Sequence, residues 1–247
     1  MFEQKEEIAQ NESDLFHDTH TIEQFAELLR EIDEKHGRKT EGHIKDYERA
    51  FDADEEELLK GVVLNIGDPF IRLPADHKNV ISLDYFYGTD AEEDINRLEK
   101  EANLSEHQKE TLAMYRRWIV KTKKAKQKAD GRAVKGVFPA LPFRDESFNR
   151  VLSLNAISMH PFDELTGFSQ EQWRMWWTEI IRVLKPGGSA YIGPFDRLNE
   201  HETFMMKKML ARMQGEGILA YRIQETEDNP PQGPEYVYVK KLSEEEK

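Results

Sequence analysis

The sequence predicts an α/β protein built on a doubly wound, mainly parallel sheet. From Gly61 onward, short apolar runs alternate with amphipathic segments of helical period, which is typical of βαβ units. Two later apolar runs are separated by the turn-rich stretch EDNPPQGPE, which indicates an antiparallel hairpin at one edge of the sheet. The hydrophobic content of 38% is enough for one substantial core in a chain of 247 residues.

Each strand is predicted from an apolar run that ends at a polar or turn-forming stretch. The runs expected to form the parallel part of the sheet are Val62–Ile66, Val80–Leu83, Val134–Phe138, Arg150–Leu154 and Ser189–Ile192. The hairpin is expected from Ile218–Ile223 and Tyr236–Lys240, which brings the predicted sheet to seven strands.

Residues 1–60 are predicted to form an acidic helical extension, and residues 61–247 the α/β domain. A helix should begin near Thr21, where Gln24 completes a capping box, and end near Gly37. A second, short helix is expected in the stretch FDADEEELLK. The acidic run within it lacks the glycine that a calcium-binding loop needs at its sixth position, so we do not expect a metal there.

A long insertion, residues 86–132, separates the second predicted strand from the third. It should hold two helices, the second of which begins at Ser105 with Gln108 in a capping box. That helix carries a basic run, Arg116–Arg132. The run is either a solvated helix face or a patch for a phosphate-rich partner such as a nucleic acid, and the sequence leaves both interpretations open.

Charge and composition narrow the class of protein. Against 35 basic residues stand 48 acidic ones, and the net charge of −13 argues against general affinity for nucleic acid. There is no cysteine, which excludes disulfides and cysteine-based metal sites. The charged start MFEQKEEIAQ lacks the apolar core of a signal peptide, and no apolar run approaches a membrane span. We therefore expect a cytoplasmic protein without a membrane partner.

In a doubly wound sheet, ligands bind at the carboxyl ends of the strands, where the strand order reverses. The first predicted strand runs into Gly67 and Asp68, and the second is followed by Asp84. In such domains an acidic residue about 20 positions beyond the first glycine holds a ribose hydroxyl. Asp84 lies at about that distance, and its carboxylate can accept two hydrogen bonds from a vicinal diol. A simple strand-end cap is the alternative role for this residue.

Two further stretches carry a family resemblance. The first is the turn LPFRDESFN, Leu141–Asn149, which leads into the fourth strand. The second is Glu179 followed by RVLKPGG, Arg182–Gly188. Together with the first two strands, they resemble the class I methyltransferases that use S-adenosylmethionine, over about residues 60–195. The resemblance implies a Rossmann-like methyltransferase fold and methyl transfer from that cofactor to an acceptor that the sequence does not identify.

The second motif is predicted to be mainly architectural. Trp173, Trp176 and Trp177 recur at helical spacing with later apolar residues and should form a face that packs on the sheet. Pro186 should stop the helix, and the two glycines after it should turn the chain into the fifth strand.

The resemblance also implies roles for individual residues. The residues expected to bind the cofactor are Asn65, Ile66, Gly67, Asp84, Tyr85, Leu141, Asn155 and Ala156. Among them, Asp84 would hold the ribose, and Tyr85 and Leu141 would border the adenine. Asn155, His160 and Asp163 are the candidates for acceptor positioning or acid–base chemistry.

The chain departs from the family pattern at the cofactor loop. The family usually has an acid followed by three spaced glycines, whereas here Asn65 replaces the acid and only Gly67 remains. We expect Asp68 and Phe70 to crowd the space of the cofactor. Val137 also stands where the family often has an acid that binds adenine. Methyl transfer is the function that the motifs predict. The departures at the cofactor site are the reason for an alternative hypothesis, a catalytically inactive binding or scaffold module. A dehydrogenase is disfavoured because the GxGxxG signature is absent.

Overall fold

The computed structural model describes residues 44–68, 71–84, 106–136, 140–154, 170–195, 200–225 and 235–246, with Glu92, Asn96 and Lys100. The strands are β1 (Val63–Ile66), β2 (Val80–Asp84), β3 (Ala133–Lys135), β4 (Phe148–Leu154), β5 (Leu184–Gly193), β6 (Leu219–Glu225) and β7 (Glu235–Lys241). The helices are α3 (Ile44–Phe51), α4 (Glu55–Leu58), α5 (Arg72–Asp76), α7 (Glu106–Ala129), α8 (Gln170–Val183) and α9 (Glu200–Gly215).

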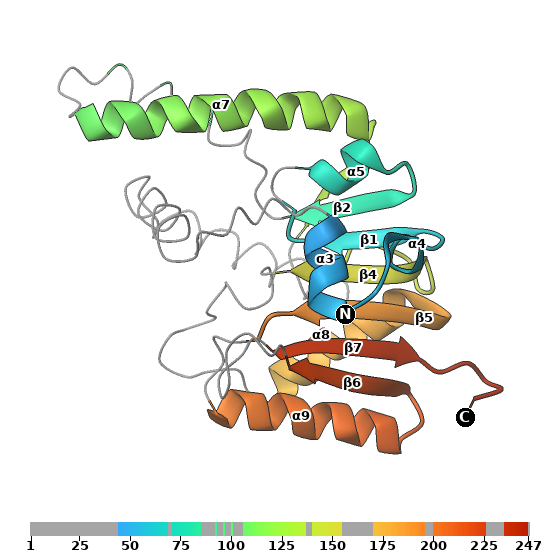
Figure 1. Ribbon diagram of the computed structural model, residues 1–247. Helices are drawn as coiled ribbons and strands as arrows, with labels where there is room; N and C mark the ends of the chain where they lie inside the picture. The colour runs from blue at the N-terminus through green and yellow to red at the C-terminus, as the bar shows by residue number, and fades with distance from the viewer. Residues whose placement is uncertain are drawn as a thin grey trace, which may run out of the picture.

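The seven strands form one sheet in the order β3-β2-β1-β4-β5-β7-β6. The first five are parallel to one another, while β7 runs antiparallel to both β5 and β6. The predicted fold class, a doubly wound sheet with an antiparallel edge hairpin, is therefore confirmed (Figure 1). Because the chain runs from β1 outward to β3 and then returns to β4, the strand order reverses between β1 and β4.

The junction between α8 and β5 differs from the prediction. We expected Pro186 and the following glycines to turn the chain before the strand begins, but β5 starts at Leu184, directly after the helix. Gly187 has a φ of 73°, and the pairing of β4 with β5 is irregular between Phe148 and Arg150. The glycine turn is thus accommodated as an irregularity within the strand.

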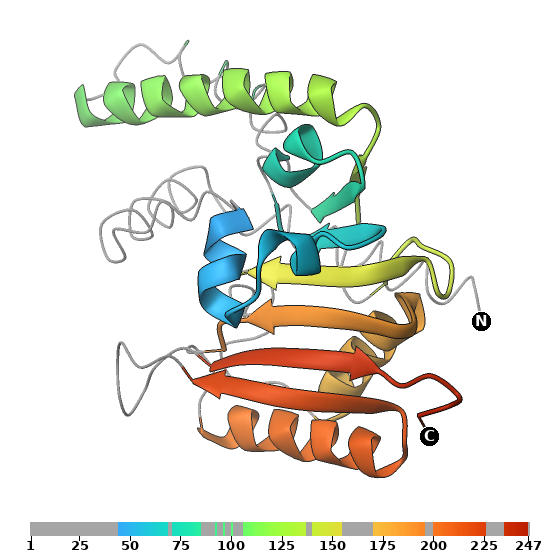
Figure 2. The same cartoon turned by 45° about the vertical axis from the view of Figure 1, so that its right-hand side comes forward.

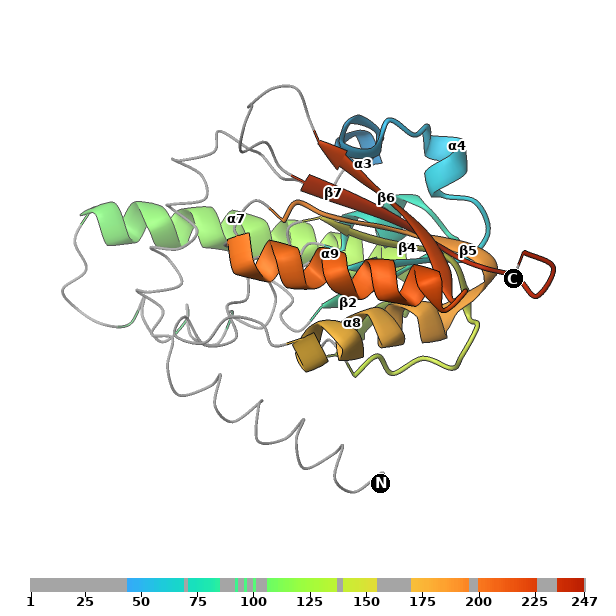
Figure 3. The same cartoon turned by 90° about the horizontal axis from the view of Figure 1, so that it is seen from below.

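One face of the sheet is covered by α8 and α9 (Figure 3). As predicted, the tryptophans of α8 form its buried face: Trp173 and Trp177 are at most 1% exposed. They share a core cluster with apolar side chains of β1, β4 and β5, and with the methionines of α9. Spacing of apolar residues at helical period therefore predicted the α8 part of this layer correctly, whereas α9 was not predicted.

The opposite face is covered by α3 and α4 (Figure 3). Phe51 of α3 is 1% exposed and makes edge-to-face contacts with Tyr191 of β5 and Tyr236 of β7. Leu58 of α4 is fully buried in the same cluster. The division of the chain at residue 60 remains a prediction, but these two helices, which precede it, supply core residues to the sheet that follows it.

The predicted long helix of the insertion is confirmed as α7, which lies beyond β2 and α5 (Figures 1 and 2). Its last turn packs there, where Ala129 is fully buried against Ile71. Two of its basic residues bond to the segment before it: Lys123 pairs with Glu92 at 2.6 Å, and Arg116 donates to Asn96 Oδ1 at 2.6 Å. The other predicted helix of the insertion lies outside the described residues.

The predicted helix from Thr21 to Gly37 also lies outside the described residues. Within the described part of the chain, no helix is long and apolar enough to cross a membrane. The same part contains no cluster of three or more acidic or histidine side chains that could hold a metal ion.

Candidate cofactor site

The predicted site residues of β1 and β2 lie together at the carboxyl edge of the sheet. The two strands pair in parallel up to Ile66 and Leu83. The amide of Gly67 then donates to the carbonyl of Leu83 at 2.9 Å, which places the glycine beside Asp84, the last residue of β2. Because β1 also borders the point where the strand order reverses, this is the place where a doubly wound sheet binds its ligand.

The backbone conformation at position 67 favours glycine. Its φ is 82°, in the left-handed region that a side chain disfavours, so the chain leaves β1 by a turn that glycine makes at little cost. The preceding Ile66 is 4% exposed and its side chain packs in the core cluster under α8. Of these two predicted cofactor residues, Ile66 is a buried strand residue, and Gly67 has the left-handed backbone conformation.

Asp68 does not crowd the edge as we expected. Its side chain is 3% exposed and turns into the protein, where the carboxylate accepts hydrogen bonds from the amides of Arg72 and Leu73 at 3.3 Å each. These amides begin α5 and lack partners within the helix, so the carboxylate satisfies donors that would otherwise be buried without one. The side chain that follows the single glycine therefore caps a helix.

Asn65 is the partner that makes this arrangement possible. It is 1% exposed, and its Nδ2 donates to Asp68 Oδ2 at 3.3 Å. Its Oδ1 accepts from the hydroxyl of Tyr47, in α3, at 2.7 Å. A side chain here must donate on one side and accept on the other, which an amide does and a carboxylate does not. Replacement of the family's acid by asparagine is thus matched by the acid at position 68.

Burial governs the ionisation of this group of side chains. It raises the pKa of Asp68 above its ordinary value of 3.8, while hydrogen bonds from the α5 amides, Ser82 and Asn65 act in the opposite direction. Burial also raises the pKa of Tyr47, with a smaller contribution from the Asp68 carboxylate, so the tyrosine hydroxyl stays protonated. Tyr47 can therefore act as the hydrogen-bond donor to Asn65 that the distances indicate.

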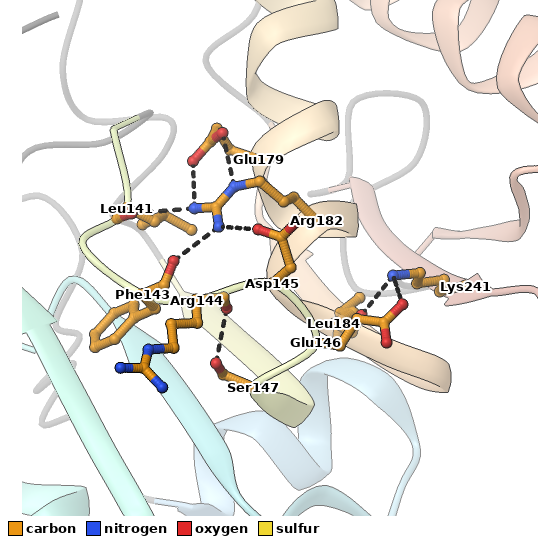
Figure 4. A network of polar contacts seen from close by, with 10 residues as sticks. All are labelled: Leu141, Phe143, Arg144, Asp145, Glu146, Ser147, Glu179, Arg182, Leu184 and Lys241. Atoms are coloured by element: carbon orange, nitrogen blue, oxygen red, sulfur yellow. Dashed lines mark hydrogen bonds and ion pairs between the residues drawn. The ribbon is translucent and has the colours of Figure 1, made fainter. Parts of the chain in front are cut away.

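The LPF turn is held by Arg182, near the end of α8 (Figure 4). Its guanidinium donates to the carbonyls of Leu141 and Phe143 at 3.1 and 2.7 Å. It also pairs with the carboxylates of Asp145 and Glu179, each at 2.8 Å. One planar guanidinium thus joins the turn before β4 to the helix after it, so the two motifs are in direct contact.

Leu141, predicted to border the adenine, is 5% exposed and packs in the core cluster with Ile66 and Leu83. Its position next to the carboxyl half of β2 keeps that role open as a prediction. The other residues named from the sequence lie outside the described part of the chain, so their predicted roles stay predictions: Phe70, Tyr85, Val137, Asn155, Ala156, His160 and Asp163.

Sequence reasoning missed Tyr47 and Ser82 as members of this site and misjudged Asp68. The alternation along β2 places Ser82 on the same face as Asn65, its partner in the strand register, and this could have been recognised. No local signal connects Tyr47 with Asn65, because their contact depends on where α3 packs. The buried position of Asp68 is likewise set by α5 and not by its neighbours in sequence.

The strand order and the edge residues resemble those of the class I methyltransferases, and comparison with known families agrees. A family model described as "Methyltransferase domain" matches residues 113–192, from the middle of α7 to β5. This match confirms the predicted resemblance to the methyltransferases that use S-adenosylmethionine. The matched range includes the LPF and RVLKPGG motifs and begins after β1, so it does not include the altered loop. No curated protein matches the chain.

Similar solved structures are distant in sequence. A protein assigned as an S-adenosyl-L-methionine-dependent methyltransferase of Methanococcus maripaludis is 16% identical, with a TM-score of 0.45 over 89% of this chain and 93% of that one. The N-methyltransferase NodS of Bradyrhizobium japonicum is 8% identical, with a TM-score of 0.43 over 81% and 96%. Likenesses this distant do not bear on substrate or site residues.

The cofactor of this family is S-adenosylmethionine, and the described edge fits it. Gly67 presents backbone without a side chain, and Asp84 is a partly exposed acceptor beside it. Asp68, the residue that seemed to obstruct the site, is buried elsewhere. The α5 amides are already bonded to Asp68, so they do not serve as ligands for a cofactor carboxylate.

Proposed function

We propose that the protein transfers a methyl group from S-adenosylmethionine to an acceptor. The observation that carries this proposal is that Asp68 turns inward and caps α5, which leaves Gly67 and Asp84 adjacent at the switch point of the sheet. Asp68, one of the departures that favoured an inactive protein, therefore does not stand in the cofactor's place. The family match over residues 113–192 supports the same function.

Each edge residue has a role that follows from its chemistry. The Asp84 carboxylate would accept hydrogen bonds from the ribose hydroxyls, and the backbone at Gly67 would approach the methionine part of the cofactor. Asn155, His160 and Asp163 are proposed to position the acceptor. The bound cofactor supplies a methyl group on a sulfonium, which is a good leaving group. The protein's task is then to align the acceptor and exclude water.

Calorimetric titration with S-adenosylmethionine and S-adenosylhomocysteine tests the proposal. We expect binding in the micromolar range, and we expect Asp84→Asn to weaken it by about tenfold to a hundredfold, because a hydrogen bond to a charged acceptor is lost. Asp130→Asn is the matched control: Asp130 is exposed at the end of α7, and asparagine tolerates its φ of 49°. Equal affinity of the Asp84 variant and the wild type would remove the ribose assignment.

The alternative function, a catalytically inactive binding module, predicts a different result. A folded protein that binds neither ligand at millimolar concentration would overturn the enzymatic proposal and leave the scaffold function.

One observation bears on a partner for either function. Four basic residues of α7 lie at helical spacing on one stripe, and all are exposed: Arg117, Lys121, Lys124 and Lys128. Within the described part of the chain, their charged side-chain groups have no hydrogen-bond or ion-pair partner. Such a stripe on a chain with a net charge of −13 would concentrate positive potential on a single surface. We propose that it binds a phosphate-rich polymer such as RNA.

Fluorescence anisotropy with a labelled single-stranded RNA tests this second proposal. Affinity should fall steeply with added salt and should fall further in the variant Lys121→Glu/Lys124→Glu. The control Lys60→Glu/Lys208→Glu changes the net charge equally at two exposed lysines on other helices or turns. If both double variants bind equally well, or binding does not depend on salt, the stripe is a solvated face.

A further inference from the structure

The hydroxyl of Tyr47 joins two strands of the sheet from outside it. Tyr47 lies in α3, is 2% exposed, and donates to Asn65 Oδ1 in β1 at 2.7 Å. The same hydroxyl accepts from the backbone amide of Leu154, the last residue of β4, at 3.2 Å. One buried oxygen thus contacts both strands near their carboxyl ends.

These two strands need such a link at that point. The register of β1 with β4 extends from Val63 opposite Arg150 to Asn65 opposite Leu152 and then ends. Beyond it, β4 is paired with β5 as far as Leu154 and Gly193. The Leu154 amide is therefore bonded to a side chain where the β1–β4 ladder has stopped. Because the strand order reverses between β1 and β4, the gap lies at the switch point, where the ligand of this fold binds.

The direction of each hydrogen bond in this chain is determined. The Leu154 amide can only donate, so the Tyr47 oxygen accepts from it and directs its own hydrogen to Asn65 Oδ1. Asn65 must then turn Nδ2 toward Asp68, whose carboxylate can only accept when ionised. The arrangement continues from Asp68 to the amides of α5. Buried bonds in such a series polarise and strengthen one another.

We infer that Tyr47 is a positioning residue for the cofactor pocket. Its hydroxyl fixes the distance between the carboxyl ends of β1 and β4, and it orients the Asn65–Asp68 pair below Gly67. Cofactor affinity then depends on α3, a helix outside the region matched by the family model. This inference rests on the proposed binding of S-adenosylmethionine.

The test compares Tyr47→Phe with Tyr191→Phe in the full chain. Both remove one buried or half-buried tyrosine hydroxyl from the same aromatic cluster, but the Tyr191 hydroxyl donates to Glu57 Oε1 at 2.7 Å and touches neither strand end. Affinity for S-adenosylhomocysteine is measured by calorimetry, and stability by thermal unfolding. We expect Tyr47→Phe to weaken binding by about tenfold and Tyr191→Phe to leave it unchanged, at similar losses of stability.

A second variant separates positioning from general destabilisation. Asn65→Ala removes the acceptor of the Tyr47 hydroxyl while keeping the ring, and its effect on affinity should not add to that of Tyr47→Phe, because both break the same series. Unchanged affinity in Tyr47→Phe, or equal weakening in the Tyr191 control, would overturn the inference alone. Failure of the wild type to bind either ligand would overturn the proposed function and this inference together.

Discussion

Asn65 and Asp68, three residues apart, form a buried amide–carboxylate pair in which Asn65 Nδ2 donates to Asp68 Oδ2 at 3.3 Å. The family's acid at the end of the first strand is thus displaced to the position after the glycine. An amide now stands where the acid was. The pair explains how the residue after the single glycine can carry a carboxylate that turns away from the edge.

Introducing a second carboxylate into this buried pair should strongly destabilise the folded protein. Asn65→Asp would bring two acids together in the interior, and we expect it to lower the free energy of unfolding by about 3 kcal/mol at neutral pH. The exchange Asn65→Asp/Asp68→Asn restores one acid and one amide, and it should be more stable than Asn65→Asp alone. Urea denaturation of the four proteins forms the cycle. Strictly additive losses would show that the two side chains do not interact.

Stability should depend on pH through Asp68. Burial raises the pKa of this carboxyl in the folded protein above 3.8, so between the two values the folded state binds more protons than the unfolded state. The stabilisation from this group is therefore fully present below pH about 4 and decreases as pH rises through the folded pKa. We expect the wild type to lose stability relative to Asp68→Asn over that window, measured by urea denaturation. A difference that grows in favour of the wild type would show that the hydrogen bonds outweigh burial.

Substitution of Gly67 separates backbone strain from ligand contact. Gly67→Ala places a side chain at a φ of 82°, and we expect a stability loss of about 1 kcal/mol. Gly131→Ala is the control, since Gly131 has a φ of 75° and no atom within 4 Å of an added Cβ. Thermal unfolding should show similar losses in both, but only Gly67→Ala should weaken binding of S-adenosylhomocysteine. Equal binding by the two variants would exclude close approach of the cofactor at Gly67.

The contacts of the Arg182 guanidinium should contribute more to the free energy of unfolding than an ordinary surface ion pair does. Arg182→Ala leaves the carbonyls of Leu141 and Phe143 without their donor, and we expect a loss of about 2 kcal/mol, with Arg182→Lys intermediate. Arg212→Ala breaks an exposed pair between α9 and Glu216, the residue after the helix, and should cost less than about 0.5 kcal/mol. Denaturation midpoints compare them. A loss for Arg182→Ala as small as that of the control would make the motif dispensable for the fold.

The helices α3 and α4 should be required for folding of the sheet. A fragment of residues 61–247 would expose the apolar face that Phe51 and Leu58 cover, whereas a fragment of residues 43–247 retains it. We expect the shorter fragment to lose its near-ultraviolet circular dichroism and to bind a hydrophobic dye. Cooperative unfolding of the shorter fragment at the same midpoint as the longer one would support an independent domain from residue 61.

Local pattern was sufficient for most of the fold. The strands and α8 follow from the spacing of their apolar residues, because each buries one face or stripe against its neighbours and the spacing records that burial. The hairpin follows from the turn residues between its strands. Placement of Gly67 beside Asp84 also followed, since parallel strands end at the same edge of a sheet. The sequence by itself therefore determined the class of fold and the edge at which its ligand should bind.

Only the tertiary structure decided which way the side chains at that edge point. From sequence, Asp68 reads as an obstruction, and Tyr47 carries no signal at all. In the structure the carboxylate accepts from the first amides of α5, and the hydroxyl bonds to the Leu154 amide where β1 and β4 stop pairing. Hydrogen-bond partners of buried polar groups come from whichever elements pack nearby, and that proximity is a property of the folded chain.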